Sequence, residues 1–513
     1  MQKILRISLN LIPLLVMIIF GYYLMGANFG AELGMIDDHE VAMFLGQDGK
    51  IEIGEIPSLL ATTEVGEWGE ALRFRPVYYT LRITESMLWK YDGGLWYFSR
   101  FVIYIFSFYL MYRLLAKFFP RIISYLFVFY ALTMPFWPDM LTRLGPSEIY
   151  TVPAILIFLW GLVAIIKNQT TNWSWMLLTV GYLICVGSKE NFLFLFPIIF
   201  TLAGYRMFTK QVTRVEIVHY LVMLALTLYV GSSIIVATSQ MGVDFYKTNI
   251  SYGDRIVTFL KNIVDTVRSR HVEFALLATL VYGVSQIKKS LRNQKVITHL
   301  VVIIVIFLIA ASQYIFYNNT LPSNSRYDFP ALLLFPIMNL VAVRMILISI
   351  KSKSLELPAK LAAYGGLAVF MLYFIATRSY TLIHLQAQKN ADASSDFASG
   401  LDLVEERLKQ DDEVPLVFVS HRFIDFEPIV SISRYLTARG IVNPMVIEYT
   451  PEKFKPGENL EIDLNQRLER ASEMGGESEE LFSRFSPLTE YEECYSISFG
   501  RENVSECELI TSF

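Results

Sequence analysis

The stretch Gly34-Met35-Ile36-Asp37-Asp38-His39-Glu40-Val41 decides how the rest of the chain is interpreted. It follows closely on an apolar segment, residues 4–25, that is long enough to cross a bilayer as a helix. That segment lacks the small-residue cleavage site of a signal peptide, so we expect it to be retained. The stretch therefore places several carboxylates and an imidazole at the water-facing end of a membrane helix. Charged groups are costly so close to hydrocarbon, so a cluster there indicates a function.

The composition is that of a membrane protein. Of the 513 residues, 54% are hydrophobic and 18% are charged, and the mean hydropathy is +0.42. Soluble domains carry roughly 25% charged residues. Aromatic residues make up 14% of the chain, as expected where Trp and Tyr lie at membrane interfaces. The net charge of -4 and the lack of a basic run argue against a nucleic-acid partner.

Apolar runs of roughly 20 residues predict about eleven transmembrane helices. The predicted spans are residues 4–25, 96–116, 121–138, 147–166, 173–187, 192–208, 216–237, 271–287, 296–317, 329–348 and 358–376. Basic residues fall in every second connection, which by the positive-inside rule predicts a cytoplasmic N-terminus and an extracytoplasmic C-terminus. These residues are Lys3, Arg6, Arg113, Lys117, Arg121, Lys167, Arg206, Lys210, Arg214, Lys288, Lys289, Arg292, Lys295, Arg344, Lys351 and Lys353.

The chain divides into two predicted parts. Residues 1–376 form the transmembrane module, whose long first outer loop, 26–95, is expected to hold short interfacial helices. Residues 377–513 are more charged and predict a small extracytoplasmic α/β domain, with strands at 415–420 and 443–449 around a helix at 428–439. The acidic stretch 451–480 is expected to be a loop.

The chain has three cysteines, and a disulfide near the C-terminus is plausible if that end is extracytoplasmic. Cys185 lies in an apolar run and is expected to be a buried small hydrophobe. Cys494 and Cys507 lie together near the C-terminus, where either a disulfide or two free thiols fits the sequence.

The acidic cluster has two interpretations. Asp37 at a helix N-cap with Glu40 three residues later resembles a capping box, and acids suit a helix N-terminus. That interpretation needs neither Asp38 nor His39. A carboxylate crowded by other carboxylates near lipid has a raised pKa, which suits a general base.

Two further outer connections carry paired charges. Arg143-Leu-Gly-Pro-Ser-Glu148 is explained either by helix initiation at Pro146 or by a site that faces the acidic cluster. Lys189-Glu190 breaks the positive-inside pattern. It is explained either by a snorkelling lysine paired with its neighbour or by a phosphate-binding pair.

A late outer connection holds Arg326-Tyr327-Asp328-Phe329-Pro330. It fits a simple turn, but an Arg fork also matches the oxygens of a phosphate. Arg73 and Arg75 in the first outer loop are further candidates for phosphate binding. Acids in the first outer loop and single basic residues in separate outer connections thus converge on one face of the membrane.

This pattern resembles the GT-C superfamily of polyprenyl-phosphate-sugar-dependent glycosyltransferases. The shared features are a first helix leading to an outer loop that opens with an acidic pair, here Asp37-Asp38, and a second acid after the third span, here Glu148. Many bacterial members also carry a late Arg-Tyr-x-x-Pro element, here residues 326–330. The resemblance covers roughly residues 1–376, and it implies a GT-C-like helical fold in a bacterial-type inner membrane.

The resemblance implies an inverting transfer of a sugar from a polyprenyl phosphate to an acceptor hydroxyl at the outer face. The acceptor would be on a glycan, a lipid or a protein. Asp37 or Asp38 would be the base, and Glu148 would orient the acceptor or help bind a metal. The substrate-binding residues would be His39, Glu40, Arg73, Arg75, Arg143, Lys189, Glu190, Arg326 and Tyr327. A divalent metal is compatible with these acids, but none is expected to be obligatory.

Two other classes of function fit the sequence. A transporter or flippase of a lipid-linked or anionic substrate would place polar groups in the middle of its spans. A non-catalytic assembly protein would tolerate amides in place of the acidic cluster. The polar residues of this chain concentrate at the outer ends of the spans, which favours the transferase.

Overall fold

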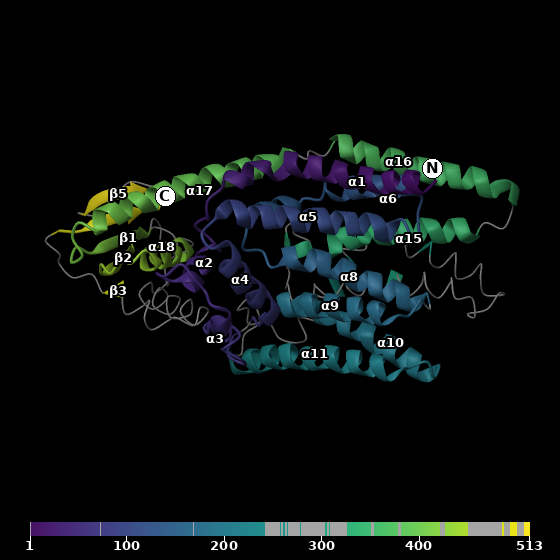
Figure 1. Ribbon diagram of the computed structural model, residues 1–513, viewed down its shortest axis with the longest axis horizontal. Coiled ribbons are helices and arrows are strands. Elements are labelled where there is room, and N and C mark those ends of the chain that lie inside the picture. Colours follow the sequence, from purple (N-terminus) through teal and green to yellow (C-terminus); the bar gives the residue numbers. More distant parts are fainter. Residues whose placement is uncertain are drawn as a thin grey trace.

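The computed structural model describes residues 2–71, 73–167, 169–241, 326–349, 353–377, 381–420, 426–449, 485–486, 493–499 and 507–512, with isolated positions between 257 and 307. Figure 1 shows helices aligned along the long axis of the molecule and a β-sheet at one end. Apart from isolated positions, the predicted spans 271–287 and 296–317 lie outside the described residues, as does the whole predicted loop 451–480.

The described chain is mostly helical. Its first part contains α1 (Gln2–Met25), η1 (Gly26–Gly30), α2 (His39–Leu45), η2 (Ile53–Glu55), α3 (Ile56–Ala61) and α4 (Pro76–Trp89). The bundle continues with α5 (Gly93–Leu115), α6 (Arg121–Ala131), α7 (Trp137–Thr142), α8 (Glu148–Ile166), α9 (Asn172–Ser188), η3 (Glu190–Leu195), α10 (Phe196–Phe208) and α11 (Arg214–Met241). Later elements are η5 (Arg326–Asp328), α15 (Ala331–Ser349), α16 (Lys353–Thr377) and α17 (Thr381–Leu408).

Several helices are long and apolar enough to cross a membrane. In the described part of the chain there are six such segments: Leu11–Gly30, Gly93–Leu115, Glu148–Ile166, Glu190–Phe208, Arg214–Gln240 and Glu356–Leu408. Each overlaps one of the predicted spans. Their surfaces carry large exposed apolar side chains, such as Ile19, Leu221 and Phe370, as helices facing lipid require. These features indicate an integral membrane protein.

The predicted span 121–138 is wrong. Helix α6 ends at Ala131 after 11 residues, about 17 Å of helix, which is too short to cross the hydrocarbon core. The chain restarts as the separate short helix α7, which has Pro138 in its first turn. Pro135 and Pro138 lack the backbone N–H that a continuous helix would need. The predicted spans 173–187 and 329–348 correspond to α9, with 17 residues, and to α15.

The helix α4 packs inside the protein rather than along its lipid-facing surface. Tyr78, Tyr79, Arg82, Ile83 and Ser86 are buried on one face, and the helix contacts α2, α3, α5 and α9. The predicted interfacial helices of the loop 26–95 therefore include one that carries side chains into the interior.

The two ends of the bundle differ in charge. Helix α8 begins at Glu148 and is followed by Lys167, 19 residues later and about 28 Å away. At that far end, Lys167 and Arg344 both lie against the ring of Phe118. The basic connections thus gather away from Asp37, as their alternation along the sequence predicts. Which end faces the cytoplasm stays a prediction.

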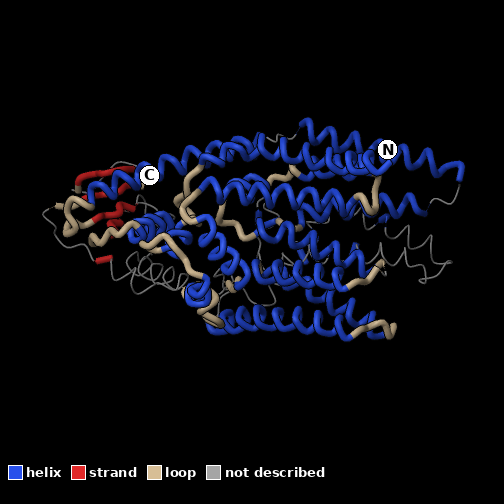
Figure 2. The backbone as a smooth tube through the Cα atoms, viewed as in Figure 1, coloured by secondary structure: helices blue, strands red, loops and turns tan. Residues whose placement is uncertain are grey.

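A parallel sheet forms the C-terminal end of the molecule, as Figure 2 shows. Its strands are β1 (Leu416–Ser420), β2 (Met445–Tyr449), β3 (Phe485–Ser486), β4 (Tyr495–Ser498) and β5 (Glu508–Ser512), in the order β3-β2-β1-β4-β5. In the central strand, Leu416 pairs with Met445 on one side and Tyr495 on the other. With helix α18 (Phe426–Ala438), the two strands and the helix predicted from the sequence are confirmed.

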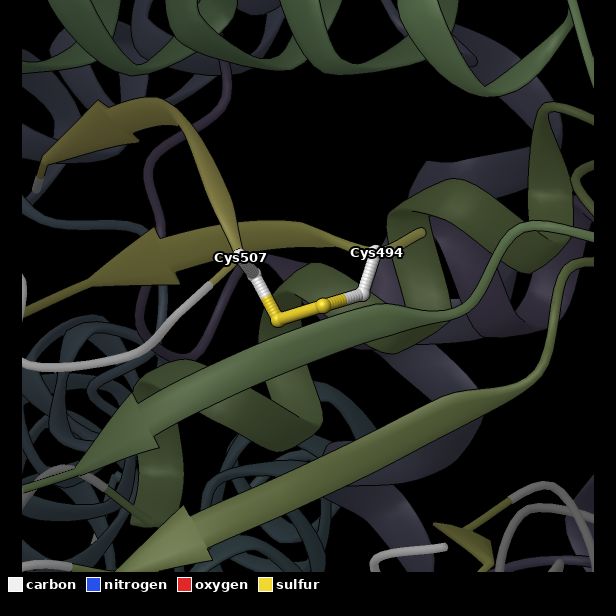
Figure 3. The surroundings of a disulfide bond; sticks show 2 residues. All are labelled: Cys494 and Cys507. Carbon is white, nitrogen blue, oxygen red and sulfur yellow. A yellow bond between two sulfur atoms is a disulfide. The ribbon is translucent and has the colours of Figure 1, made fainter. Parts of the chain in front are cut away.

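Cys494 and Cys507 form a disulfide with an S–S distance of 2.04 Å (Figure 3). It joins the starts of β4 and β5 and packs against the buried side chains of Val417, Val419 and Val446. The free-thiol alternative is therefore wrong, while Cys185 is buried and free as predicted.

Helices α17 and α18 attach the sheet to the bundle. Asn390 of α17 donates to Asn28 Oδ1 (3.2 Å) and to the Tyr97 hydroxyl (2.8 Å). On α18, the Tyr435 hydroxyl donates to the carbonyl of Gly34 (3.0 Å), and Ser431 donates to the carbonyl of Met35. The first segment of the predicted α/β domain, α17, is thus a helix that packs against the bundle. Helix α18 packs on the 34–41 stretch.

Candidate functional site

The acidic stretch does not act as a helix cap. Helix α2 begins at His39, so Asp38 occupies the N-cap position, and its side chain makes no capping hydrogen bond. Its Oδ2 instead accepts the backbone N–H of Gly34 (2.8 Å). The capping explanation for the stretch is therefore wrong, and another reason is needed for its charges.

Asp37 is held at the edge of the protein. It adopts a left-handed backbone conformation, with φ 68°, which few residues other than Gly, Asn and Asp tolerate. Its Oδ2 accepts from Arg143 Nη2 (2.7 Å), its backbone carbonyl accepts from Arg82 (3.1 Å), and its side chain is 29% exposed. A Cβ on Gly145 would overlap the Asp37 side chain, so a glycine is needed where the two loops meet.

Asp38 and Glu40 point inward to the buried Arg82. Arg82 Nη2 lies 3.6 Å from Asp38 Oδ1, and Arg82 Nε lies 3.5 Å from Glu40 Oε2. Burial raises the pKa of Asp38 to about 6 against the opposing charge of Arg82. Burial also raises the pKa of Glu40, whose Oε2 lies 3.1 Å from the Tyr78 hydroxyl.

His39 is also buried beside this group. Burial, followed by the charge of Arg434, lowers its pKa well below the ordinary range. Its Nδ1 has no hydrogen-bond partner among the described residues. His39 is therefore a neutral side chain behind the site rather than a charged ligand.

Replacing Asp38 with asparagine is expected to flatten the dependence of stability on pH. The pKa of Asp38 rises from 3.8 to about 6 on folding, so its contribution is greatest below about pH 4 and is lost as the pH rises through about 6. Asparagine does not titrate. The fall in the free energy of unfolding between about pH 4 and pH 7 should shrink by about 3 kcal/mol, at about 1.4 kcal/mol per pKa unit.

The measurement is thermal unfolding of the purified protein in detergent at both pH values. Asp48→Asn is the matched control, because Asp48 is exposed and the substitution makes the same chemical change. Equal pH dependence in the wild type and in Asp38→Asn would show that Asp38 does not titrate in this window.

A line of alternating charges runs from Asp37 across the site. Arg143 bridges Asp37 to Asp139, with Nη1 3.2 Å from Asp139 Oδ1. The other oxygen of Asp139 lies 3.4 Å from Arg326 Nε. Helix α8 has Ser147 at its N-cap, so Pro146 precedes the helix instead of occupying its first position, while Glu148 lies in the first turn as the helix-initiation alternative predicts.

Lys189 and Glu190 pair with different partners, so the alternative of a snorkelling lysine paired with its neighbour is wrong. Lys189 forms an ion pair with Glu148, and both side chains are buried, with residue exposures of 2% and 3%. Glu190 accepts two bonds from Arg75, at 3.0 and 3.1 Å. The adjacent residues point apart because Lys189 ends α9 in an extended conformation, with φ -156°.

Arg326 has a buried N–H without a hydrogen-bond acceptor among the described residues, at its Nη1. The Tyr327 ring lies 5.3 Å from Arg326 Cζ and 5.6 Å from Lys189 Nζ. Because buried polar groups are normally hydrogen-bonded, this N–H in a place with a second cation suits an anionic ligand.

Arg73 and Arg75 of the first outer loop lie in different environments. The charge of Arg75 is already matched by Glu190, and its side chain is mostly buried. Arg73 is half-buried, and its charge lowers the pKa of both Glu64 and Glu427, although burial raises each pKa overall. Arg73 therefore lies beside the line of charges, and Arg75 lies behind it.

Several residues of the site were not among the predicted ones. Asp139 joins Arg143 to Arg326, and its i, i+4 spacing from Arg143 was a signal that could have identified it. Glu427 is placed near Asp37 by α18, and its pKa is raised by burial first and then by Asp37. Burial raises the pKa of Glu64 to about 7, and nothing in its local sequence marks it.

The acids of the site are distributed among cations. Asp37 pairs with Arg143, Glu148 with Lys189, and Asp38 and Glu40 both face Arg82. Across the described ranges, no three His, Cys, Asp or Glu side chains form a group that could hold a metal ion. Metal dependence stays a prediction.

The chain matches no protein-family model and no curated protein sequence. Its structure is similar to the crystal structure of ArnT from Cupriavidus metallidurans bound to undecaprenyl phosphate, with 12% sequence identity and a TM-score of 0.41. The match covers 90% of this chain and 88% of that chain. A likeness this weak assigns neither family nor function, so the function must come from the site itself.

Proposed function

We propose that this protein is a membrane glycosyltransferase that moves a sugar from a polyprenyl phosphate to an acceptor hydroxyl. The observation that carries the proposal is the line of charges from Asp37 to Arg326. It has a partly exposed carboxylate at one end and, at the other, a guanidinium N–H that has no acceptor in the described part of the chain. A transfer from a lipid phosphate needs a base and an anion site held at such fixed positions.

Asp37 is the proposed general base. Its Oδ2 is held by Arg143, and within the described part of the chain no hydrogen bond reaches its Oδ1. That oxygen takes the proton of the acceptor hydroxyl while the acceptor oxygen forms a bond to the anomeric carbon. The bond from that carbon to the phosphate oxygen breaks, so the anomeric configuration is inverted. Asp38 is less suited to this role because it is buried and accepts the Gly34 N–H.

Arg326 and Lys189 are the proposed phosphate ligands. The leaving polyprenyl phosphate gains negative charge as the bond breaks, and nearby cations stabilise that charge. Arg326 offers Nη1, and Tyr327 lies beside both cations. Glu148 forms an ion pair with Lys189 and holds it in place. We therefore assign Glu148 the role of positioning Lys189 rather than that of orienting the acceptor. Arg82 holds the Asp37 loop in place by donating a hydrogen bond to the backbone carbonyl of Asp37.

A structure of the full-length protein in lipid nanodiscs with added polyprenyl phosphate tests this proposal. We expect a phosphate oxygen within about 3 Å of Arg326 Nη1 or Lys189 Nζ, with the Asp37 carboxylate one sugar ring away. Lipid phosphate bound elsewhere, or an Asp37 side chain that faces no cavity, would overturn the transferase and favour transport or assembly. The particular sugar and acceptor then follow from which polyprenyl-phosphate sugars are consumed.

A further inference from the structure

We propose that the basic end of the bundle, opposite Asp37, binds the phosphate headgroup of an anionic membrane lipid in a cavity between α5, α6 and α8. This inference is independent of the sugar-transfer function. The cavity has a volume of about 240 Å³. Its lining combines three basic side chains with two aromatic rings: Tyr112, Arg113, Ala116, Lys117, Arg121 and Trp160.

The cations of this cavity have no acidic partner in the part of the chain that the structure describes. Arg113 donates to the Tyr109 hydroxyl (3.0 Å), and Lys117 Nζ lies 3.5 Å from the centre of the Trp160 ring. Among the described residues, no carboxylate forms an ion pair with Arg113, Lys117 or Arg121. The site at the other end differs in this respect, because every cation there that we assign to phosphate binding also faces an acid.

The electrostatic environment of Lys117 favours an anion. Burial, followed by the charges of Lys167 and Arg113, lowers its pKa to about 8. Burial, followed by the charge of Arg344, also lowers the pKa of Lys167. These groups repel one another, and a bound phosphate would relieve that repulsion.

Further hydrogen-bond donors lie near the cavity. Lys167 Nζ lies 4.0 Å and Arg344 Cζ 5.7 Å from the centre of the Phe118 ring. The buried Nε of Arg344 has no hydrogen-bond partner among the described residues. Helix α6 begins here after Pro120 without a side-chain cap, so its first N–H groups are available to an anion.

An apolar track favours a lipid over free phosphate. Val102 and Phe106 are exposed on α5 (47% and 49%), and they share one face of that helix with Arg113, which lies seven residues after Phe106. Ile122 on α6 is 62% exposed beside the first turn of that helix. Acyl chains lying along this surface would place the headgroup at the cavity.

The test compares anionic lipid retained by the full-length protein after purification from vesicles of phosphatidylcholine with added phosphatidylglycerol. Native mass spectrometry gives the number of bound lipids and their affinity. Lys117→Gln with Arg121→Gln should weaken phosphatidylglycerol binding about 25-fold, since each basic residue contributes about a factor of five. Lys210→Gln with Arg214→Gln is the matched control, because both residues are exposed and lie in another basic connection.

Selective loss in the cavity variant, with the control unchanged, supports the site. Equal loss in both variants shows general attraction of lipid to basic connections and overturns it. Inorganic phosphate provides the second arm: if it displaces the lipid completely at millimolar concentration, free phosphate is the ligand and the lipid assignment fails. A double variant that does not fold is replaced by Arg121→Gln alone, because Arg121 is exposed; it should weaken phosphatidylglycerol binding about fivefold, and unchanged binding would overturn the site.

Discussion

Replacing Asp37 with asparagine is expected to reduce sugar transfer by about 10²- to 10⁴-fold, the contribution of a general base. The amide cannot take the acceptor proton, while the phosphate ligands Arg326 and Lys189 are unchanged. The measurement is the release of free polyprenyl phosphate from a polyprenyl-phosphate sugar in proteoliposomes. Binding of polyprenyl phosphate itself should stay within about twofold of the wild type, because Asp37 is not among its proposed ligands.

Asparagine is the right substitution because the backbone at Asp37 restricts the choice. With φ 68°, this position tolerates Asn nearly as well as Asp, whereas Ala would add backbone strain to the loss of the carboxylate. Arg143 also keeps an acidic partner, since Asp139 lies 3.2 Å from its other terminal nitrogen. The variant should therefore fold, and thermal unfolding provides the check.

Asp139→Asn is the matched control for Asp37→Asn. It removes the same charge from the same arginine, yet Asp139 is not the proposed base. Transfer should fall much less in Asp139→Asn than in Asp37→Asn. If the two variants lose the same activity, Asp37 acts only by positioning Arg143. Normal activity in both Asp37→Asn and Asp38→Asn would rule out a catalytic acidic pair.

The sequence predicted the location of the site better than it predicted which residues form ion pairs there. Hydropathy located the helix ends, so Asp37, Arg143 and Lys189 were expected on one face. Their ion pairs depend on helix packing, since Arg143 is 106 residues from Asp37 and Lys189 is 41 residues from Glu148. Local spacing carries no information at that range, which explains why the sequence offered only the neighbouring Glu190 as an acidic partner for Lys189.

The accuracy with which short helices and strands were predicted also depended on what a local sequence pattern contains. The strands at 416–420 and 445–449 were found because their apolar runs fit a buried parallel sheet. The span at 121–138 was misjudged because hydropathy ignores the two prolines that divide α6 from α7. Glu427 was missed because its approach to Asp37 depends on how α18 packs on α2, which composition does not encode.

Replacing Lys189 with methionine is expected to destabilise the protein by about 3–5 kcal/mol, because it leaves Glu148 buried without its partner. Thermal or denaturant unfolding in detergent measures this loss. Removing both charges in Lys189→Met with Glu148→Gln should recover most of it, since no uncompensated buried charge remains. Recovery of stability alone would follow from any buried ion pair, so it does not distinguish a structural role from phosphate binding.

Binding of polyprenyl phosphate distinguishes the two roles. The stable double variant should still bind the lipid phosphate at least tenfold more weakly than the wild type, because a charge-assisted bond is worth about 1.5–3 kcal/mol. Glu148→Gln alone gives the opposite pattern: it removes the carboxylate that forms an ion pair with Lys189, so added polyprenyl phosphate should raise the unfolding temperature of this variant more than that of the wild type. Wild-type affinity in the double variant would make Lys189 purely structural and would leave Arg326 as the candidate phosphate ligand.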